Sequence, residues 1–219
     1  MAEREPVRLS VLISGRGTNL QSIMDAVERR ELRAVIKLVI SNRADAPGLM
    51  RAQCKEIPTR VIDHRHFGSR EEFDHALVEA LRAAQVELVA CAGFMRILSP
   101  VMVDAFPNRI MNIHPSLLPA FPGLHAQKAA LEHGARVAGC TVFFVTAGTD
   151  DGPIIVQAAV PVMPDDDEQA LSDRILAQEH RIYPLAINLF QQGRLRVLGR
   201  KVVILDAPTP DEKLSLIHI

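Results

Sequence analysis

The stretch "LSVLISGRGTNLQSI", residues 9–23, indicates how this chain folds. Leu9–Ile13, apolar except for Ser10, has the length of a buried strand, and a helical pattern follows over about Leu20–Arg30. Gly15 and Gly17 separate the two patterns. A buried strand that turns through glycine into a helix is the first unit of an α/β fold with a parallel sheet.

The same alternation of strand and helix patterns continues through the first half of the chain. Strands are predicted at 34–40, 86–93 and 108–114, and helices in a short stretch through Met50 and over 69–84. The longer helix has a capping box, in which Ser69 precedes Glu72 by three residues. These units predict a mostly parallel, twisted sheet with helices on both faces.

The second half of the chain has a different pattern. Two apolar runs, 139–146 and 153–162, are separated by a loop too short for a helical crossover, so they are expected to pair antiparallel. A long helix then starts at Asp165 and Glu168, and Pro184 is expected to kink or split it. Residues 194–205 are typical of a closing hairpin. We therefore predict an antiparallel portion in the C-terminal half of the sheet.

The simplest domain organisation is one domain over residues 1–207. It has two structural halves with different patterns. Residues 208–219 have no turn or strand-pairing pattern, and we expect a tail that is disordered or foreign to the native protein.

Composition excludes several classes of partner. The chain has 219 residues, 48% of them hydrophobic, and a net charge of −1 with no block of like charge. A protein that binds nucleic acid or an anionic membrane through bulk charge would show a basic face. The three cysteines lie far apart and form no metal-binding or redox pair, and no apolar run has transmembrane length. We expect a soluble, cytoplasmic protein.

The glycine loop is a candidate phosphate site. Gly15 and Gly17 lie before a helix N-terminus, where free amides and the helix dipole favour an anion, while Thr18 and Asn19 can cap the helix or contact an oxygen. The loop lacks the third glycine of a dinucleotide fingerprint and the lysine of a nucleotide-triphosphate loop. It therefore favours a monophosphate, and a merely tight turn is the alternative.

A second candidate site follows the strand predicted at 108–114. Asn112 and His114 lie two residues apart, so on an extended segment their side chains point to the same side. Open α/β sheets bind their ligands at such strand ends. Three prolines then keep the backbone extended and prevent a helix from covering the site: Pro115, Pro119 and Pro122. A structural His and a capping Asn are the alternative interpretation.

The loop "GTDDGP" adds two carboxylates, Asp150 and Asp151. A carboxylate beside His114 would orient its ring and favour the protonated form. Asp-Gly is also an ordinary turn signal, and spacing alone leaves the pairing of His114 with a residue thirty-six positions later open.

Four motifs in this order resemble the phosphoribosylglycinamide formyltransferases, folate-dependent enzymes of purine biosynthesis: "ISGRGTNLQ", "AGFMRILSP", "NIHPSLLPAFPG" and "GTDDGPIIVQAAVPV". The resemblance covers roughly Leu9 to Leu195. It implies a Rossmann-like fold whose N-terminal half binds the nucleotide and whose C-terminal half binds the folate. It also implies transfer of the formyl group of 10-formyltetrahydrofolate to the amine of glycinamide ribonucleotide. It further implies a co-substrate but no metal, small-molecule partners only, and a monomer or homodimer.

The resemblance also assigns residues by matching position. The positions that match the catalytic residues of the family are Asn112, His114 and Asp150. Those that match its ribonucleotide site are Gly15, Gly17, Thr18, Asn19 and Glu179. Those that match its folate pocket are Arg96, Ile97, Leu98 and Val145. The chain departs from the family where Phe143 replaces a commonly polar residue, and where Ala147 and Gly148 replace a more acidic pair.

Other functions fit the sequence less well. Methionyl-tRNA formyltransferase has an additional C-terminal domain, and formyltetrahydrofolate deformylase an additional N-terminal one, whereas the first strand here begins at Leu9. The loop "PAFPGLH" after His114 differs from that of sugar-nucleotide formyltransferases. A dinucleotide oxidoreductase, or a non-catalytic nucleotide-binding protein, would rest on the glycine loop alone and would leave Asn112 and His114 without a role.

Overall fold

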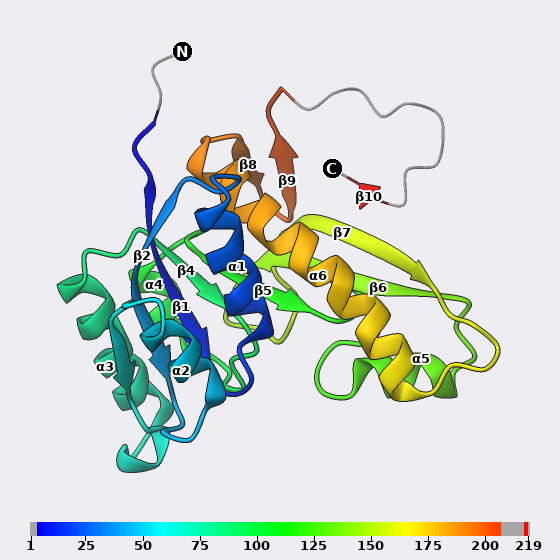
Figure 1. Ribbon diagram of the computed structural model, residues 1–219, viewed down its shortest axis with the longest axis horizontal. Helices are drawn as coiled ribbons and strands as arrows, with labels where there is room; N and C mark the ends of the chain where they lie inside the picture. The colour runs from blue at the N-terminus through cyan, green and yellow to red at the C-terminus, as the bar shows by residue number, and fades with distance from the viewer. Residues whose placement is uncertain (1–3, 207–216, 219) are drawn as a thin grey trace.

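The protein, seen here as a computed structural model that describes residues 4–206 and 217–218, is built on one mixed sheet (Figure 1). The strand order is β3-β2-β1-β4-β5-β6-β7-β9-β8, and β10 pairs with β7. The strands are β1 (Val7–Ile13), β2 (Ala34–Ser41), β3 (Thr59–Val61), β4 (Leu88–Cys91), β5 (Ile110–His114), β6 (Val137–Phe144), β7 (Ile154–Pro161), β8 (Leu195–Leu198), β9 (Lys201–Ile204) and β10 (Ile217–His218).

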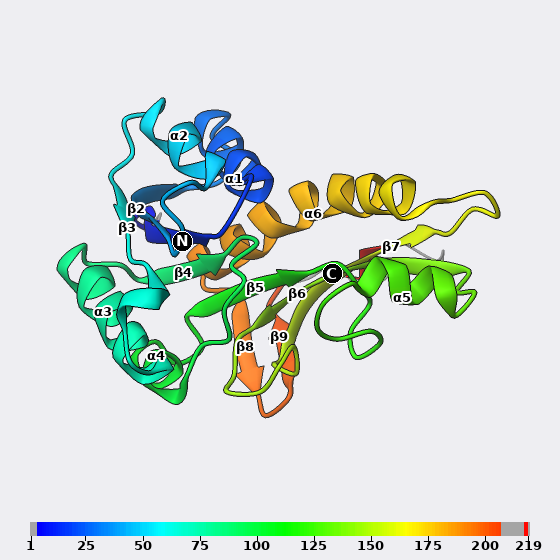
Figure 2. The same ribbon diagram turned by 90° about the horizontal axis from the view of Figure 1, so that it is seen from below.

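Helices cover both faces of the sheet, as predicted. They are α1 (Thr18–Glu28), α2 (Pro47–Gln53), α3 (Arg70–Ala83), α4 (Pro100–Ala105), α5 (Ala126–Glu132) and α6 (Glu168–Gln191), with a short 3₁₀ turn at His64–His66. Figure 2 shows α1, α2 and α6 on one side of the sheet and α3 and α4 on the other.

Side chains of β1 pack into two hydrophobic cores, one on each face of the sheet. Leu9, Val11 and Ile13 belong to the cluster that includes residues of α1 and α6, whereas Leu12 belongs to the cluster that includes residues of α3 and α4. Successive side chains of a strand point to opposite faces. A strand buried on both faces therefore has the nearly continuous apolar sequence from which it was predicted.

The predicted mixture of strand directions is confirmed. β1 pairs parallel with β2 and β4, and β4 pairs parallel with β5. The direction reverses at β6, which is antiparallel to both β5 and β7. β8 and β9 form the predicted antiparallel hairpin.

Pro184 was expected to kink or split the last helix, and a split is wrong. α6 runs unbroken from Glu168 to Gln191, and its N-cap is Asp167, two residues after the predicted start. The side chains on both sides of the proline, Tyr183 and Ala186 among them, are fully buried. Packing along the whole helix therefore outweighs the hydrogen bond that proline cannot make.

Four short elements were not predicted: β3, α4, α5 and β10, the last of which lies in the tail that was expected to pair with no strand. Each has seven residues or fewer, so none offers a full hydrophobic period to detect. Residues 207–216 and 219, most of the predicted tail, lie outside the described residues. Within the described ranges, no helix is long and apolar enough to cross a membrane.

A buried tyrosine joins α6 to the centre of the sheet. The hydroxyl of Tyr183 lies 2.9 Å from the carbonyl oxygen of Cys91 in β4 and 3.0 Å from that of Met111 in β5, so it can donate to both. Tyr183 is fully buried, so water cannot replace this donor.

We expect Tyr183→Phe to lower the free energy of unfolding by about 1–2 kcal/mol, because the substitution leaves the ring in place and removes only the shared hydrogen bond. Urea denaturation of the two proteins measures this difference. Equal free energies of unfolding would show that the hydroxyl contributes nothing to the attachment of α6.

Candidate active site

Two of the candidate catalytic residues lie on the strand at which the direction of the sheet reverses. Asn112 and His114 both lie on β5, the last strand of the parallel part of the sheet. Asn112 is half-buried and pairs with Cys91 on one side and Phe143 on the other. Its side chain makes no hydrogen bond with another described residue, so its amide is available to a ligand.

The structure brings His114 and Asp150 together. Nδ1 of the buried His114 ring lies 3.5 Å from Oδ2 of Asp150. The other ring nitrogen, Nε2, lies 2.9 Å from the carbonyl oxygen of Phe121 and must donate to it, because a carbonyl only accepts. Asp150 is itself held by the N–H of Gly123, which donates to Oδ2 at 2.8 Å. Both nitrogens of the ring therefore face oxygen acceptors.

The proline-rich loop after β5 forms a rigid boundary of the site. The hydroxyl of Thr141 on β6 donates to the carbonyl of Ser116 and accepts from the N–H of Leu118. Gln157 on β7 donates to the carbonyl of Leu118 at 2.9 Å. The loop is thus attached to the neighbouring antiparallel strands. It contains no helix, as expected, but the prediction that its backbone is extended is wrong: residues 115–125 run through bends and turns, and Phe121 has a φ of 49°.

The glycine loop turns directly from β1 into α1. Gly17 is the N-cap of α1 and has a φ of 70°, a conformation that favours glycine. A Cβ atom on Gly17 would lie 2.8 Å from the Cα atom of Gly48 at the start of α2. Glycine is therefore needed both for the turn and for the close packing of the two helices. Neither Thr18 nor Asn19 caps α1, since no side chain makes a cap hydrogen bond.

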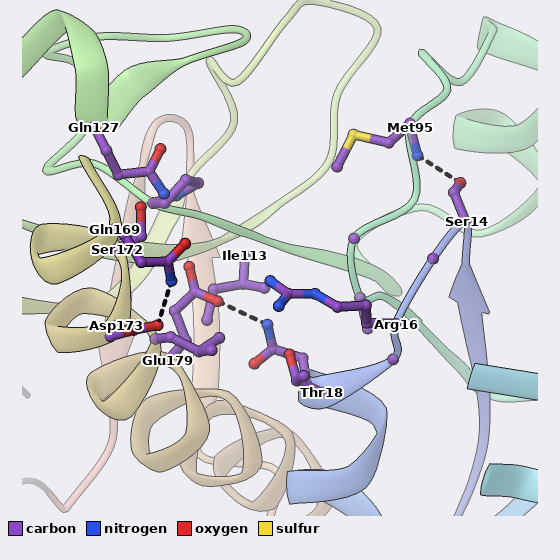
Figure 3. Close-up of a pocket in the computed structure, with 17 residues that line it drawn as sticks. Ser14, Arg16, Thr18, Met95, Ile113, Gln127, Gln169, Ser172, Asp173 and Glu179 are labelled. Atoms are coloured by element: carbon purple, nitrogen blue, oxygen red, sulfur yellow. Dashed lines mark hydrogen bonds between the residues drawn. The ribbon is translucent and has the colours of Figure 1, made fainter. Parts of the chain in front are cut away.

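A cavity of about 400 Å³ opens at this loop (Figure 3). Its lining includes the predicted Gly15, Gly17, Thr18 and Asn19 from the loop and Glu179 from α6. Ile113 and Pro115, the neighbours of His114 in sequence, also line it. The cavity therefore extends from the helix N-terminus to the carboxyl end of β5.

Asn19 and Glu179 form a buried pair across the cavity. Nδ2 of Asn19 donates to Oε2 of Glu179 at 2.7 Å, and each residue is 7% exposed. Burial raises the pKa of Glu179, and the hydrogen bond from Asn19 opposes that shift. Oδ1 of Asn19 is buried without a partner among the described residues, so an acceptor is left for a ligand donor.

The residues expected at the folate pocket lie apart from this cavity. Arg96 and Ile97 are exposed, and Leu98 is buried in the cluster that includes residues of α3 and α4. Val145 packs against the same cluster, and its N–H donates to the carbonyl of Ile110 at 2.8 Å. None of the four lines the cavity.

Other cavity residues were missed by the sequence analysis. Gln169, Ser172, Asp173 and Leu176 line it from α6 together with Glu179, and Arg16 extends into it from the glycine loop (Figure 3). The spacing of three or four residues along α6 places them on one face of the helix. This spacing could have shown from the sequence that these residues share one face of α6. It could not have shown which part of the protein that face lies against.

No metal site accompanies these residues. In the part of the chain that the structure describes, no group of three or more His, Cys, Asp or Glu side chains is arranged to hold a metal ion.

The site thus combines a glycine loop at a helix N-terminus, a cavity that reaches the end of β5, and an Asn, His and Asp set. Residues 7–187 match the formyl transferase family, and the chain belongs to this family. The resemblance predicted from the four motifs is confirmed.

Within this family, individual relatives show which enzymes the chain is similar to. The phosphoribosylglycinamide formyltransferase of Escherichia coli K12 is 46% identical over 191 residues, which make up 87% of this chain and 90% of that protein. The solved structure of glycinamide ribonucleotide transformylase 1 from Symbiobacterium toebii superposes with a TM-score of 0.91 at 56% identity, covering 94% of this chain and 96% of that one. The predicted Rossmann-like fold is confirmed by this likeness.

A third relative is much longer. The trifunctional purine biosynthetic protein adenosine-3 of Drosophila pseudoobscura pseudoobscura is 52% identical over 191 residues, or 86% of this chain. The chain spans only 14% of that protein.

We expect Glu179→Gln to remove a pH dependence from the stability of the protein. Since the pKa of Glu179 is raised above 4.5, the folded protein keeps this proton at pH values at which the unfolded chain has lost it. The contribution of Glu179 to stability is therefore complete below pH 4.5 and is lost as pH rises through the folded-state pKa.

Urea unfolding between about pH 5 and about pH 8 tests this sign. The free energy of unfolding of the wild type should fall, relative to that of the variant, as pH rises. A difference that stays constant over this range would contradict the raised pKa. The amide keeps an oxygen acceptor for Asn19, so the comparison isolates the ionisation.

Proposed function

We propose that this protein transfers the formyl group of 10-formyltetrahydrofolate to the amine of glycinamide ribonucleotide, a step of purine biosynthesis. The observation that carries the proposal is the contact of His114 with Asp150, 3.5 Å apart, beside a cavity that begins at an anion-binding loop. The relatives of similar length support it, because they are named for the same transfer.

The cavity suits a ribonucleotide. Its phosphate would lie at the N-terminus of α1, where the first amides of the helix and the guanidinium of Arg16 can hold it. Glu179 and the free Oδ1 of Asn19 would accept hydrogen bonds from ribose hydroxyls. The amine end would then reach Ile113 and Pro115, next to the candidate catalytic residues.

The folate co-substrate would lie on the other side of β5. Arg96, Ile97, Leu98 and Val145 come from segments close to that strand, and the exposed Ile97 offers an apolar surface to a pterin ring. In this arrangement the formyl group would lie between the two ligands, near Asn112 and His114.

The proposed transfer is a direct attack on the formyl carbon. The amine nitrogen forms a bond to that carbon, the carbonyl oxygen takes the negative charge, and the bond to the folate nitrogen then breaks. The amide of Asn112 and the cationic ring of His114, kept charged by Asp150, would stabilise the negative charge on the oxygen, each worth about 10²–10³ in rate. Asp150 would accept the proton that the amine loses and pass it on, directly or through water, toward the leaving nitrogen. The transfer needs neither a metal nor a covalent enzyme intermediate.

The proposal also includes the setting of the enzyme. We propose a cytoplasmic protein, monomeric or homodimeric, whose single domain over residues 1–207 acts on small molecules and binds no nucleic acid. The net charge of −1 supports this. Cys91 and Cys140 support a reducing compartment, since both are buried as free thiols and burial raises the pKa of Cys91 to about 12.

An absorbance assay of folate deformylation tests the function. Cofactor turnover should require glycinamide ribonucleotide, and formylated ribonucleotide should appear in equal amount. Release of formate without the ribonucleotide would instead indicate hydrolysis and would overturn the proposal.

We expect Asp150→Asn to lower kcat by about a hundredfold or more while the KM for the ribonucleotide changes little, because proton transfer is lost and the cavity is intact. Asp151→Asn is the matched control, since this exposed neighbour contacts Thr146 and not His114. Steady-state kinetics of the three proteins decide the matter. A near-normal kcat for Asp150→Asn would remove Asp150 from the mechanism.

A further inference from the structure

An irregular segment, residues 93–99, connects the ends of two elements near the site. It begins two residues after the end of β4 and leads into α4 at Pro100, and it contains no helix or strand. It includes Arg96, Ile97 and Leu98. The backbone groups of these three residues make no hydrogen bond with any other described residue, although such groups normally have partners.

The first end of the segment is held by Ser14. The hydroxyl of this buried serine accepts a hydrogen bond from the N–H of Met95 at 2.8 Å (Figure 3). The same hydroxyl donates to Oδ1 of Asn42 at 2.6 Å, so its direction is determined. The carbonyl of Gly93 also accepts from the N–H of Ser14 at 3.1 Å.

The second end of the segment is held by Asp74. This carboxylate on α3 has no exposure to solvent and accepts a short hydrogen bond from the N–H of Ser99. Burial raises the pKa of Asp74, and the bond from Ser99 opposes the shift. Oδ1 of Asp74 and the hydroxyl of Ser99 are buried without hydrogen-bond partners among the described residues.

Such an anchor is costly for stability alone. A buried carboxylate with one unpaired oxygen loses hydration that a single hydrogen bond does not restore. An apolar residue would fill this position in the core of α3 at lower cost. A requirement for the exact position of Ser99, and of the segment before it, explains why the carboxylate is retained.

The segment held in this way presents apolar side chains to solvent. Met95 is 66% exposed and Ile97 is 53% exposed, while Leu98 between Ile97 and the second anchor is 4% exposed. A flexible loop with these side chains would lose conformational entropy when it bound a ligand. A loop fixed at both ends loses less, so the same contacts give higher affinity.

We propose that Ser14 and Asp74 are positioning residues that hold the two ends of segment 93–99, so that the free backbone groups of Arg96–Leu98 and the side chain of Ile97 are preorganised for the folate co-substrate. Neither residue need touch the folate. This inference rests on the proposed function for the identity of the ligand. It assigns to two buried polar residues a role in folate affinity and not in the transfer step.

The test compares equilibrium binding of tetrahydrofolate, the product, by titration calorimetry. Removing one anchor, in Ser14→Ala or Asp74→Ala, should raise the Kd for tetrahydrofolate about tenfold, the effect of one lost hydrogen bond to a positioned group. Asp74→Asn keeps an acceptor oxygen for Ser99 and should recover most of the affinity. In kinetics, Asp74→Asn and Asp74→Ala should raise the KM for the formyl folate, with less than about a threefold change in the KM for the ribonucleotide.

Ser10→Ala is the matched control. Ser10 lies on β1, which ends one residue before Ser14. It is buried like Ser14, and it donates to the carbonyl of Leu38 at 2.8 Å without contacting segment 93–99. It should lose a similar amount of thermal stability and keep the wild-type Kd. If Asp74→Ala does not fold, Ser14→Ala and Asp74→Asn still decide the question.

The proposal is overturned if Ser14→Ala binds tetrahydrofolate within twofold of the wild type, or if Ser10→Ala weakens binding as much as Ser14→Ala does. Failure of the proposed function gives a different result, in which the wild type binds tetrahydrofolate but transfers no formyl group and the Kd comparison still stands. A wild type that does not bind tetrahydrofolate would overturn both.

Discussion

The change of strand direction at β5 is the constraint on which the rest of the structure depends. Parallel pairing of β1, β4 and β5 brings their carboxyl ends to one edge of the sheet, where the cavity opens. Antiparallel pairing with β6 places the end of β6 beside the start of β5, since Phe144 lies opposite Met111. The loop that follows must fold back over β5 for Asp150 to reach His114. The pairing of β5 thus determines both the position of the cavity and the approach of Asp150 to His114.

Buried or partly buried carboxylates connect the parts of this site, and each contacts a residue distant in sequence. Glu179 meets Asn19, Asp74 meets Ser99, and Asp150 meets His114 and Gly123. Each carboxylate loses hydration on burial and regains only part of it from its partner. A fold selected for stability alone would use apolar residues at such positions, which is the reason why we propose that these segments serve a ligand.

Local pattern was enough for most of the fold and for part of the site. The glycine turn of Gly15 and Gly17, and the shared orientation of Asn112 and His114, follow from short-range geometry. The cavity residues on α6 were not predicted, because helical periodicity shows which residues share a face but not which element lies opposite that face. Thr141 and Gln157, which hold the proline-rich loop, read as ordinary strand residues until their partners are known.

By itself, the sequence determined the class of fold, the order of the longer strands and helices, the glycine turn and the family, because periodicity and motif spacing are local properties of a chain. Only the tertiary structure decided that Asp150 lies beside His114, that Pro184 stays within one helix, and that Ser14 and Asp74 hold the ends of segment 93–99. These contacts join segments from different elements. Their formation depends on strand pairing and packing over the whole domain, which no short stretch of the chain encodes.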